Sequence, residues 1–279
     1  MKLDGATIAI EPRSVGACVD LAVLFMGAHA VQVNGLTLIF GTPVCLLTYV
    51  LVDQFGAGLG TGLLLFFGGT PFLAAAVVAG AGHRVFGDPF TVWGTLRILA
   101  SQFFRLVCTL LLAQIVIAAS SLLCLFPTVP LSVRYGFLPE LLLLEQSRGL
   151  GFERRISDLM RGTFFDLLLR FLVIIGFYLC AVLSLFTLID LTSGIVFSTP
   201  ILFNRISSGF FFDDVEYLVM HDPLVVTTIC ATMWLAYPLA RLAWFFCYLD
   251  TRIRKEAWDV ELDFRIEAQR LEAAQQARE

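Results

Sequence analysis

Charged side chains inside strongly apolar stretches are the residues of this sequence most able to do chemistry. Arg134, Glu140 and Glu145 lie in or at the end of one such stretch, and Arg241 lies in another. A charge in hydrocarbon is costly, so it usually pairs with an opposite charge or faces a polar cavity. Two interpretations stay open for these four residues. They form structural ion pairs, or they line a path for a substrate, a proton or a lipid headgroup.

The spacing of these charges predicts where their partners lie. Arg134 and Glu140 are six residues apart, which does not bring them together on one straight helix. Arg241 precedes Asp250 by nine residues, which is about 13 Å along a helix axis. We therefore expect each of these charges to find its partner on another helix.

A second group of residues flanks the apolar stretches and could contact lipid or a partner protein. Its members are Arg154, Arg155, Arg161, Arg252, Arg254, Trp258 and Leu262. Attraction between arginines and anionic headgroups is sufficient to explain the basic members. A specific phospholipid site or a protein-docking site is the alternative.

The other candidate motifs do not predict a catalytic centre. The glycine-rich run at residues 55–62 superficially resembles a dinucleotide loop, but apolar stretches flank it instead of a strand and a βαβ unit. We interpret it as a turn leading into close helix packing, because Gly58 and Gly62 have GxxxG spacing.

The residues that commonly bind metals are also scattered. His29, His83 and His221 lie in different regions, and the seven cysteines all lie in apolar stretches without a CxxC pair. We interpret the cysteines as small hydrophobic residues within helices. We expect no catalytic residue, no cofactor and no metal ligand, and hence no enzyme.

The elements that position these residues follow from the composition. Hydrophobic residues make up 58% of the 279 residues and charged residues only 15%, against roughly a quarter charged in a soluble domain. A membrane-spanning helix needs about 20 apolar residues. The sequence predicts an all-α polytopic membrane protein with spans at residues 36–52, 61–81, 103–126, 129–144, 164–189 and 224–248.

Several segments fit a span less well. Residues 129–144 are short, charged and proline-containing, so a broken or re-entrant element is an alternative. Residues 13–31 predict an amphipathic helix in the membrane interface, with a seventh span as the alternative. Residues 90–104 and 152–165 also predict interfacial helices.

The distribution of basic residues predicts the orientation. They concentrate before the first span, between the second and third, between the fourth and fifth, and after the sixth. Positive residues mark the cytoplasmic side, so both termini are expected there. The net charge of −4 gives no electrostatic basis for nucleic-acid binding.

We divide the chain into a membrane domain, residues 1–249, and a charged cytoplasmic helix, residues 250–279. Apolar side chains recur at helical spacing along the second part. This helix packs on its own membrane domain, on a second protein or copy, or on the lipid surface.

Three stretches carry a family resemblance: RYGFLPE at 134–140, FERRISDLMRG at 152–162 and YLDTRIRKEAWDVEL at 248–262. Together they resemble bacterial proteins related to the membrane domain of glycerophosphoryl diester phosphodiesterases, over about residues 101–262. The resemblance implies a six-helix membrane domain, which in that family can be fused to a catalytic barrel. This sequence has no soluble α/β stretch long enough for such a barrel, so the resemblance does not imply phosphodiesterase activity.

The sequence thus predicts a noncatalytic scaffold or accessory subunit of a complex in the bacterial cytoplasmic (inner) membrane. Its expected partners are the lipid bilayer, including anionic phospholipids, and other membrane or cytoplasmic proteins or further copies of itself. The alternative function is a transporter or lipid-handling protein that uses a buried polar path.

Overall fold

The structure, a computed structural model, describes residues 14–85, 87, 89–123, 125–144, 151–198, 200–205 and 211–256. Within these ranges the chain is helical and contains no β-strand. The elements are α1 (Val15–Ala28), α2 (Ala30–Phe55), α3 (Leu59–Val85), α4 (Val92–Ser101), α5 (Phe103–Leu123), α6 (Leu125–Tyr135), α7 (Leu138–Leu143), α8 (Gly151–Met160), α9 (Phe164–Val196), the 3-10 turn η1 (Phe203–Arg205), α10 (Phe211–His221) and α11 (Pro223–Glu256). The all-α prediction is confirmed for the described residues.

Five of the described helices are long and apolar enough to cross a membrane. The segments that meet this criterion are Ala30–Phe55, Leu59–Val85, Phe103–Ser121, Phe164–Val196 and Pro223–Lys255. They overlap five of the six predicted spans, and each begins within six residues of its predicted start. A chain with this many apolar helices has the character of a membrane protein, since only a bilayer accommodates so much apolar helical surface.

The predicted fourth span, residues 129–144, is not one continuous helix, which agrees with the alternative of a broken element. It is divided into α6 and the six-residue α7, with a turn at Gly136 and Phe137. Pro139 has no N–H to donate to the carbonyl of Tyr135, so an unbroken helix would lose a hydrogen bond here. At the start of α7 the same proline is accommodated, because the first turn of a helix lacks intrahelical acceptors for its donors.

Helices α1, α4 and α8 lie where interfacial helices are expected. Helix α1 has 14 residues and buries Cys18, Ala22 and Phe25 on one stripe, which packs against α11. Their placement relative to a membrane stays a prediction.

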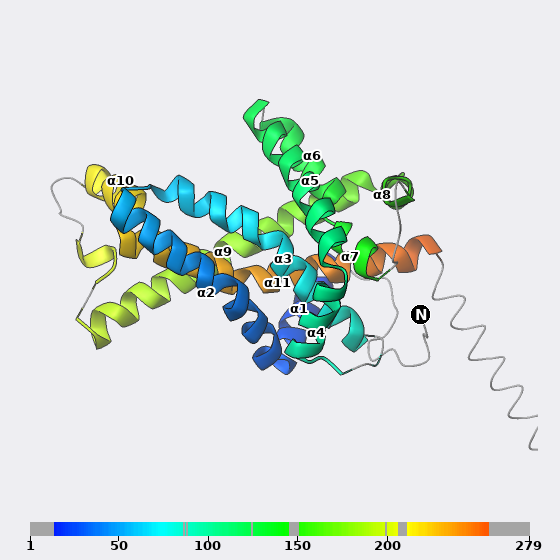
Figure 1. Ribbon diagram of the computed structural model, residues 1–279, viewed down its shortest axis with the longest axis horizontal. Helices are drawn as coiled ribbons and strands as arrows, with labels where there is room; N and C mark the ends of the chain where they lie inside the picture. Colours follow the sequence, from blue (N-terminus) through cyan, green and yellow to red (C-terminus); the bar gives the residue numbers. More distant parts are fainter. Residues whose placement is uncertain are drawn as a thin grey trace, which may run out of the picture.

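Figure 1 shows how the long helices are arranged. Helices α2, α3, α9 and α11 follow the long axis of the molecule, whereas α5 and α6 project away from it as a hairpin. Helix α10 lies at one end of the long axis and α8 at the other. We call these the α10 end and the α8 end.

Helix α11 forms the centre of the core and packs on α1, α2, α3 and α9. Its Trp234 is 2% exposed and lies against both Gly41 of α2 and Gly69 of α3, where a Cβ would come within 3.3 and 2.9 Å of the indole. Gly62 contacts Cys230 of α11 in the same manner. The glycines thus let three helix backbones approach one another around large α11 side chains.

The glycine-rich run at residues 55–62 is a turn, as the sequence predicts. Gly56 ends α2 with a φ of 64°, a conformation that glycine adopts without steric cost. The chain then enters α3, where Gly62 makes its close contact.

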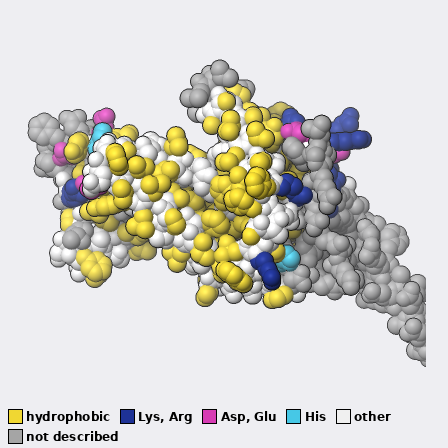
Figure 2. Space-filling view, in the orientation of Figure 1, with side chains coloured by type: hydrophobic (Ala, Val, Ile, Leu, Met, Phe, Trp, Pro, Cys, Tyr) yellow, Lys and Arg dark blue, Asp and Glu magenta, His cyan; other side chains and the backbone are white. Residues whose placement is uncertain are grey.

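The surface of the long helices is largely apolar. Figure 2 shows hydrophobic side chains over most of the visible face of the bundle, with Lys and Arg gathered toward the α8 end. On α9, Phe165, Leu169, Leu183 and Ile195 are between 62% and 82% exposed. This surface suits the hydrocarbon of a bilayer.

Candidate functional site

The helix break between α6 and α7 brings two of the predicted residues together. Arg241 of α11 donates from Nη2 to Oε2 of Glu140 at 2.5 Å and from Nη1 to the carbonyl of Gly136 at 3.0 Å. Glu140 is fully buried and Arg241 is 6% exposed. The partner of each charge therefore lies on another helix, and the break supplies the backbone carbonyl that the second guanidinium nitrogen uses.

Aromatic side chains of α11 pack on Phe137, which follows Gly136 in the turn. Trp244 stacks on Phe137 with ring centroids 4.7 Å apart, and Tyr248 lies 5.4 Å from Phe137. Arg241, Trp244 and Tyr248 are spaced i, i+3 and i+7, so they share one face of α11. Trp244 and Tyr248 were not predicted as site residues, although their helical spacing from Arg241 can be seen in the sequence.

Several buried polar atoms near the break lack a hydrogen-bond partner among the described residues. They include Oε1 of Glu140, Nε of Arg241 and Nε1 of Trp244. Arg105 of α5 also donates to the carbonyl of Leu142 in α7. Buried polar groups are normally satisfied, so these atoms mark the interior around the break as a place where a polar species could bind.

A second buried network joins α9 to α11 near the α8 end. Arg170 donates to Asp250 at 2.6 Å and lies 2.8 Å from Asp166, while Nε of Arg254 donates to Asp250 at 2.9 Å. Asp250 is 1% exposed. The predicted contact residue Arg254 therefore takes part in an intramolecular ion pair.

Arg134 has its partner on another helix, as expected, but it does not lie in the buried cluster with Glu140. Its side chain is 45% exposed and pairs with Glu153 of α8 at 2.7 Å, and Tyr135 donates to the same carboxylate at 3.2 Å. The turn at Gly136 separates Arg134 from the buried cluster, and α8 folds back to meet it. Glu145 lies outside the described residues.

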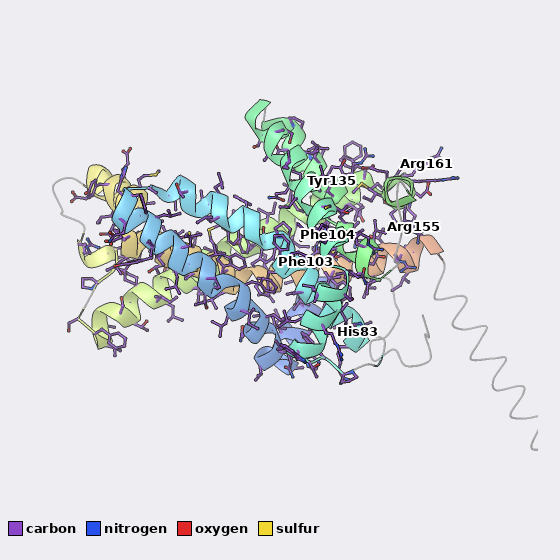
Figure 3. All side chains as sticks on the ribbon, in the orientation of Figure 1. His83, Phe103, Phe104, Tyr135, Arg155 and Arg161 are labelled. Carbon is purple, nitrogen blue, oxygen red and sulfur yellow. The ribbon has the colours of Figure 1, made fainter. Side chains whose placement is uncertain are left out.

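The predicted contact residues divide into exposed and buried members. Arg154 and Arg161 are exposed and Arg155 is half-buried; Figure 3 shows Arg155 and Arg161 at the α8 end. Arg252 was expected at the surface but is 8% exposed, because its guanidinium packs 5.8 Å over the ring of Tyr248 one turn earlier. Trp258 and Leu262 lie outside the described residues.

Lys255 was not predicted as a site residue, yet it fixes α8 to α11. Its ammonium donates to the carbonyl of Asp158 at 3.2 Å and to the carbonyl of Arg161. Asp158 lies in the last turn of α8 and Arg161 directly follows it, where a cation also interacts favourably with the helix dipole. Contacts of this kind depend on how distant segments fold together, so the sequence pattern alone does not reveal them.

The α10 end carries its own polar contacts. Asp190 of α9 is 4% exposed and accepts hydrogen bonds from the backbone N–H groups of Ile201, Leu202 and Phe203 at 2.8, 2.7 and 3.2 Å. These contacts fix the connection that follows α9.

Asp222 joins the same region to the start of α11. It accepts from Arg205 at 2.6 Å and from the N–H groups of Leu224 and Val225. Partial burial acts to raise the pKa of Asp222, but the Arg205 guanidinium and the two N–H groups outweigh it and hold the pKa below its usual value. Asp222 thus serves as an ionised N-terminal cap of α11.

No group of three or more metal-binding side chains occurs among the residues that the structure describes. The candidate site combines the buried ion pairs, the break between α6 and α7, and the exposed arginines of the α8 end. In comparisons with known proteins, no family model, curated protein or solved structure matches the chain.

Proposed function

We propose that this protein is a noncatalytic scaffold or accessory subunit of a complex in the bacterial cytoplasmic membrane. The supporting observation is the attachment of α8 to the membrane helices at both of its ends. Arg134 pairs with Glu153 near its start, and Lys255 binds carbonyls at its C-terminal end. A charged surface held rigidly on a set of apolar helices suits a docking role, since little ordering entropy remains to be lost on binding.

The proposed orientation places the α8 end in the cytoplasm, with both termini on that side. The α8 end carries the exposed Arg154 and Arg161, whereas the α10 end carries Asp53, Asp214, Glu216 and Asp222 together with Arg205. This asymmetry follows the rule that positive residues face the cytoplasm. We propose six membrane passages, of which α5 forms one and α6 with α7 forms the next. Helices α1, α4 and α8 are proposed to lie in the membrane interface.

A purification of the full chain from its native membranes in a gentle detergent tests the scaffold proposal. Native mass analysis is expected to give a mass above 30.9 kDa from stoichiometric partners or further copies of the chain. A variant that lacks residues 257–279, which lie outside the described residues, is the matched comparison and is expected to lose those partners. A strictly monomeric chain, unaffected by this deletion, would contradict the proposal.

The second candidate function is a transporter or lipid-handling protein. It is favoured by the unpartnered Oε1 of Glu140 and Nε of Arg241 beside a broken helix, which is where membrane proteins commonly bind polar species.

Purified protein in liposomes tests this second function, with an internal pH-sensitive dye for proton flux and a fluorescent phospholipid for lipid transfer. Glu140→Gln is expected to reduce whichever flux the protein supports, and Arg134→Ala is expected to leave it unchanged because Arg134 lies outside the buried cluster. Absence of any flux, or an unaltered flux in Glu140→Gln, would eliminate this function.

A further inference from the structure

Helix α8 has the position and composition of a helix that lies along a membrane surface. It is drawn end-on in Figure 1, so its axis runs across the long axis that α2, α3, α9 and α11 follow. Ile156, Leu159 and Met160 are 1%, 2% and 8% exposed and face the core. The opposite face is therefore presented outward at the α8 end.

The outward face of α8 carries basic side chains without ion-pair partners among the described residues. Arg154 and Arg161 are both exposed and are seven residues apart, so they share one face at a separation of about 10 Å. The ammonium of Lys255 lies at the Arg161 end, where it donates to the backbone carbonyls of Asp158 and Arg161. Asp158 is exposed between the two arginines and reduces the net charge of this face without cancelling it.

An exposed apolar surface begins directly after these basic residues. Four residues beyond Arg161, Phe165 is 82% exposed at the start of α9, and Leu169 and Leu172 continue the same face at 62% and 49%. Gly176, the next residue on this face, is also exposed and would admit a Cβ without contact. Basic residues are thus followed in the chain, after the turn at residues 161–163, by a helix face suited to hydrocarbon.

We propose that this surface is a binding site for an anionic phospholipid. The headgroup phosphate is held by Arg154, Arg161 and Lys255, because charge-assisted hydrogen bonds from arginine to phosphate are strong. An acyl chain lies along Phe165, Leu169 and Leu172 of α9. We assign the occupant as a diacyl lipid because basic side chains and an apolar helix face occur in the same site. This lipid site does not depend on the proposed function as a scaffold.

Native mass spectrometry of the full chain in detergent tests the site, with phosphatidylglycerol and phosphatidylcholine titrated separately. The wild type is expected to bind phosphatidylglycerol more tightly. The variant Arg154→Gln/Arg161→Gln is expected to lose about fivefold in affinity for each arginine, which corresponds to about 1 kcal/mol per basic residue at an anionic surface. Affinity for phosphatidylcholine is expected to stay the same.

Two further variants make the result specific. Arg97→Gln removes an exposed arginine of α4 and is expected to retain the phosphatidylglycerol preference. Arg154→Lys/Arg161→Lys keeps the charge and is expected to retain most of it. Melting temperatures in detergent are expected to agree among all variants, since the replaced side chains are exposed.

Three outcomes would overturn the site. They are an absence of phosphatidylglycerol preference in the wild type, an unchanged preference in the Gln/Gln variant, and an equal loss in Arg97→Gln. Glycerol phosphate carries the phosphate without acyl chains, so at millimolar concentration it is expected not to displace phosphatidylglycerol. If it displaced the lipid completely, the contact between the acyl chain and α9 would be wrong.

Discussion

At the scale of residues, the interior charges act as connectors between helices. Arg241 joins α11 to α7 through Glu140, and Arg170 joins α9 to α11 through Asp250. Removing charges from water is costly even when they pair, so such pairs contribute less to stability than their short distances suggest. Their clearer effect is on geometry, because only one register of the helices brings both partners together.

Replacing only one residue of the Glu140–Arg241 pair is expected to destabilise the fold more than replacing both. Glu140→Ala leaves the buried Arg241 charge uncompensated and is expected to lower the free energy of unfolding by about 3–5 kcal/mol. Glu140→Leu combined with Arg241→Met is expected to lower it less, because neither charge remains.

Unfolding in mixed detergent micelles measures both effects on the pair. Arg134→Ala is the control, since its half-exposed pair with Glu153 contributes at most about 1 kcal/mol. A double variant as unstable as the single one would contradict this account of the pair.

The Asp222 cap is expected to make stability depend on acid pH. The pKa of Asp222 lies below its ordinary value in the folded protein, so the unfolded chain takes up the proton first as pH falls. The stabilisation is fully present above about pH 4, the ordinary range of aspartate, and is lost as pH falls through the lower folded pKa.

Unfolding curves of the wild type and Asp222→Asn across this pH range measure the contribution of the cap. The difference between them is expected to be about 1 kcal/mol or less at neutral pH, because Arg205 is 34% exposed, and to shrink in acid. A difference that grows as pH falls would show that the cap has been misassigned.

At the scale of elements, the long helices were predictable and the connections between them were not. Five apolar segments have the length and composition of spans in both sequence and structure, because hydropathy is a local property. The prolines indicated a possible break in residues 129–144, but the position of Arg134 depends on α8 returning to place Glu153 beside it. For the same reason the sequence predicted partners on other helices for Glu140 and Arg241 without identifying them.

Two adjacent glycines of α3 offer a matched test of helix packing. A Cβ on Gly69 would come within 2.9 Å of the Trp234 ring, whereas a Cβ on Gly68 meets nothing within 4 Å. Gly69→Ala is expected to lower the free energy of unfolding by about 1–3 kcal/mol through overpacking. Gly68→Ala is expected to leave it unchanged or to raise it slightly, because alanine favours a helix more than glycine does.

Chemical unfolding of the two glycine variants beside the wild type measures this difference. Equal stability of both variants would show that the contact between α3 and Trp234 is looser than described.

At the scale of the whole molecule, charge and apolar surface are separated. The long helices expose hydrophobic side chains, and Lys and Arg gather toward the α8 end (Figure 2). In the proposed orientation, the apolar helices lie in the hydrocarbon and the basic α8 end faces the cytoplasm.

Cysteine labelling is expected to report that orientation. In a background without the seven native cysteines, Asp214→Cys at the α10 end is expected to react with a membrane-impermeant maleimide added to intact spheroplasts. Ser157→Cys on α8 is expected to react only after the membrane is opened. Reaction of both sites in intact spheroplasts, or the reverse pattern, would overturn the proposed topology.

The central position of α11 also has a consequence for biosynthesis. Helices α2, α3 and α9 all leave the ribosome before the helix around which they pack. Before α11 is made, α2 and α3 can already pack on each other, but they lack Trp234, which fills the space between Gly41 and Gly69. The core is therefore completed by the last described helix to be translated.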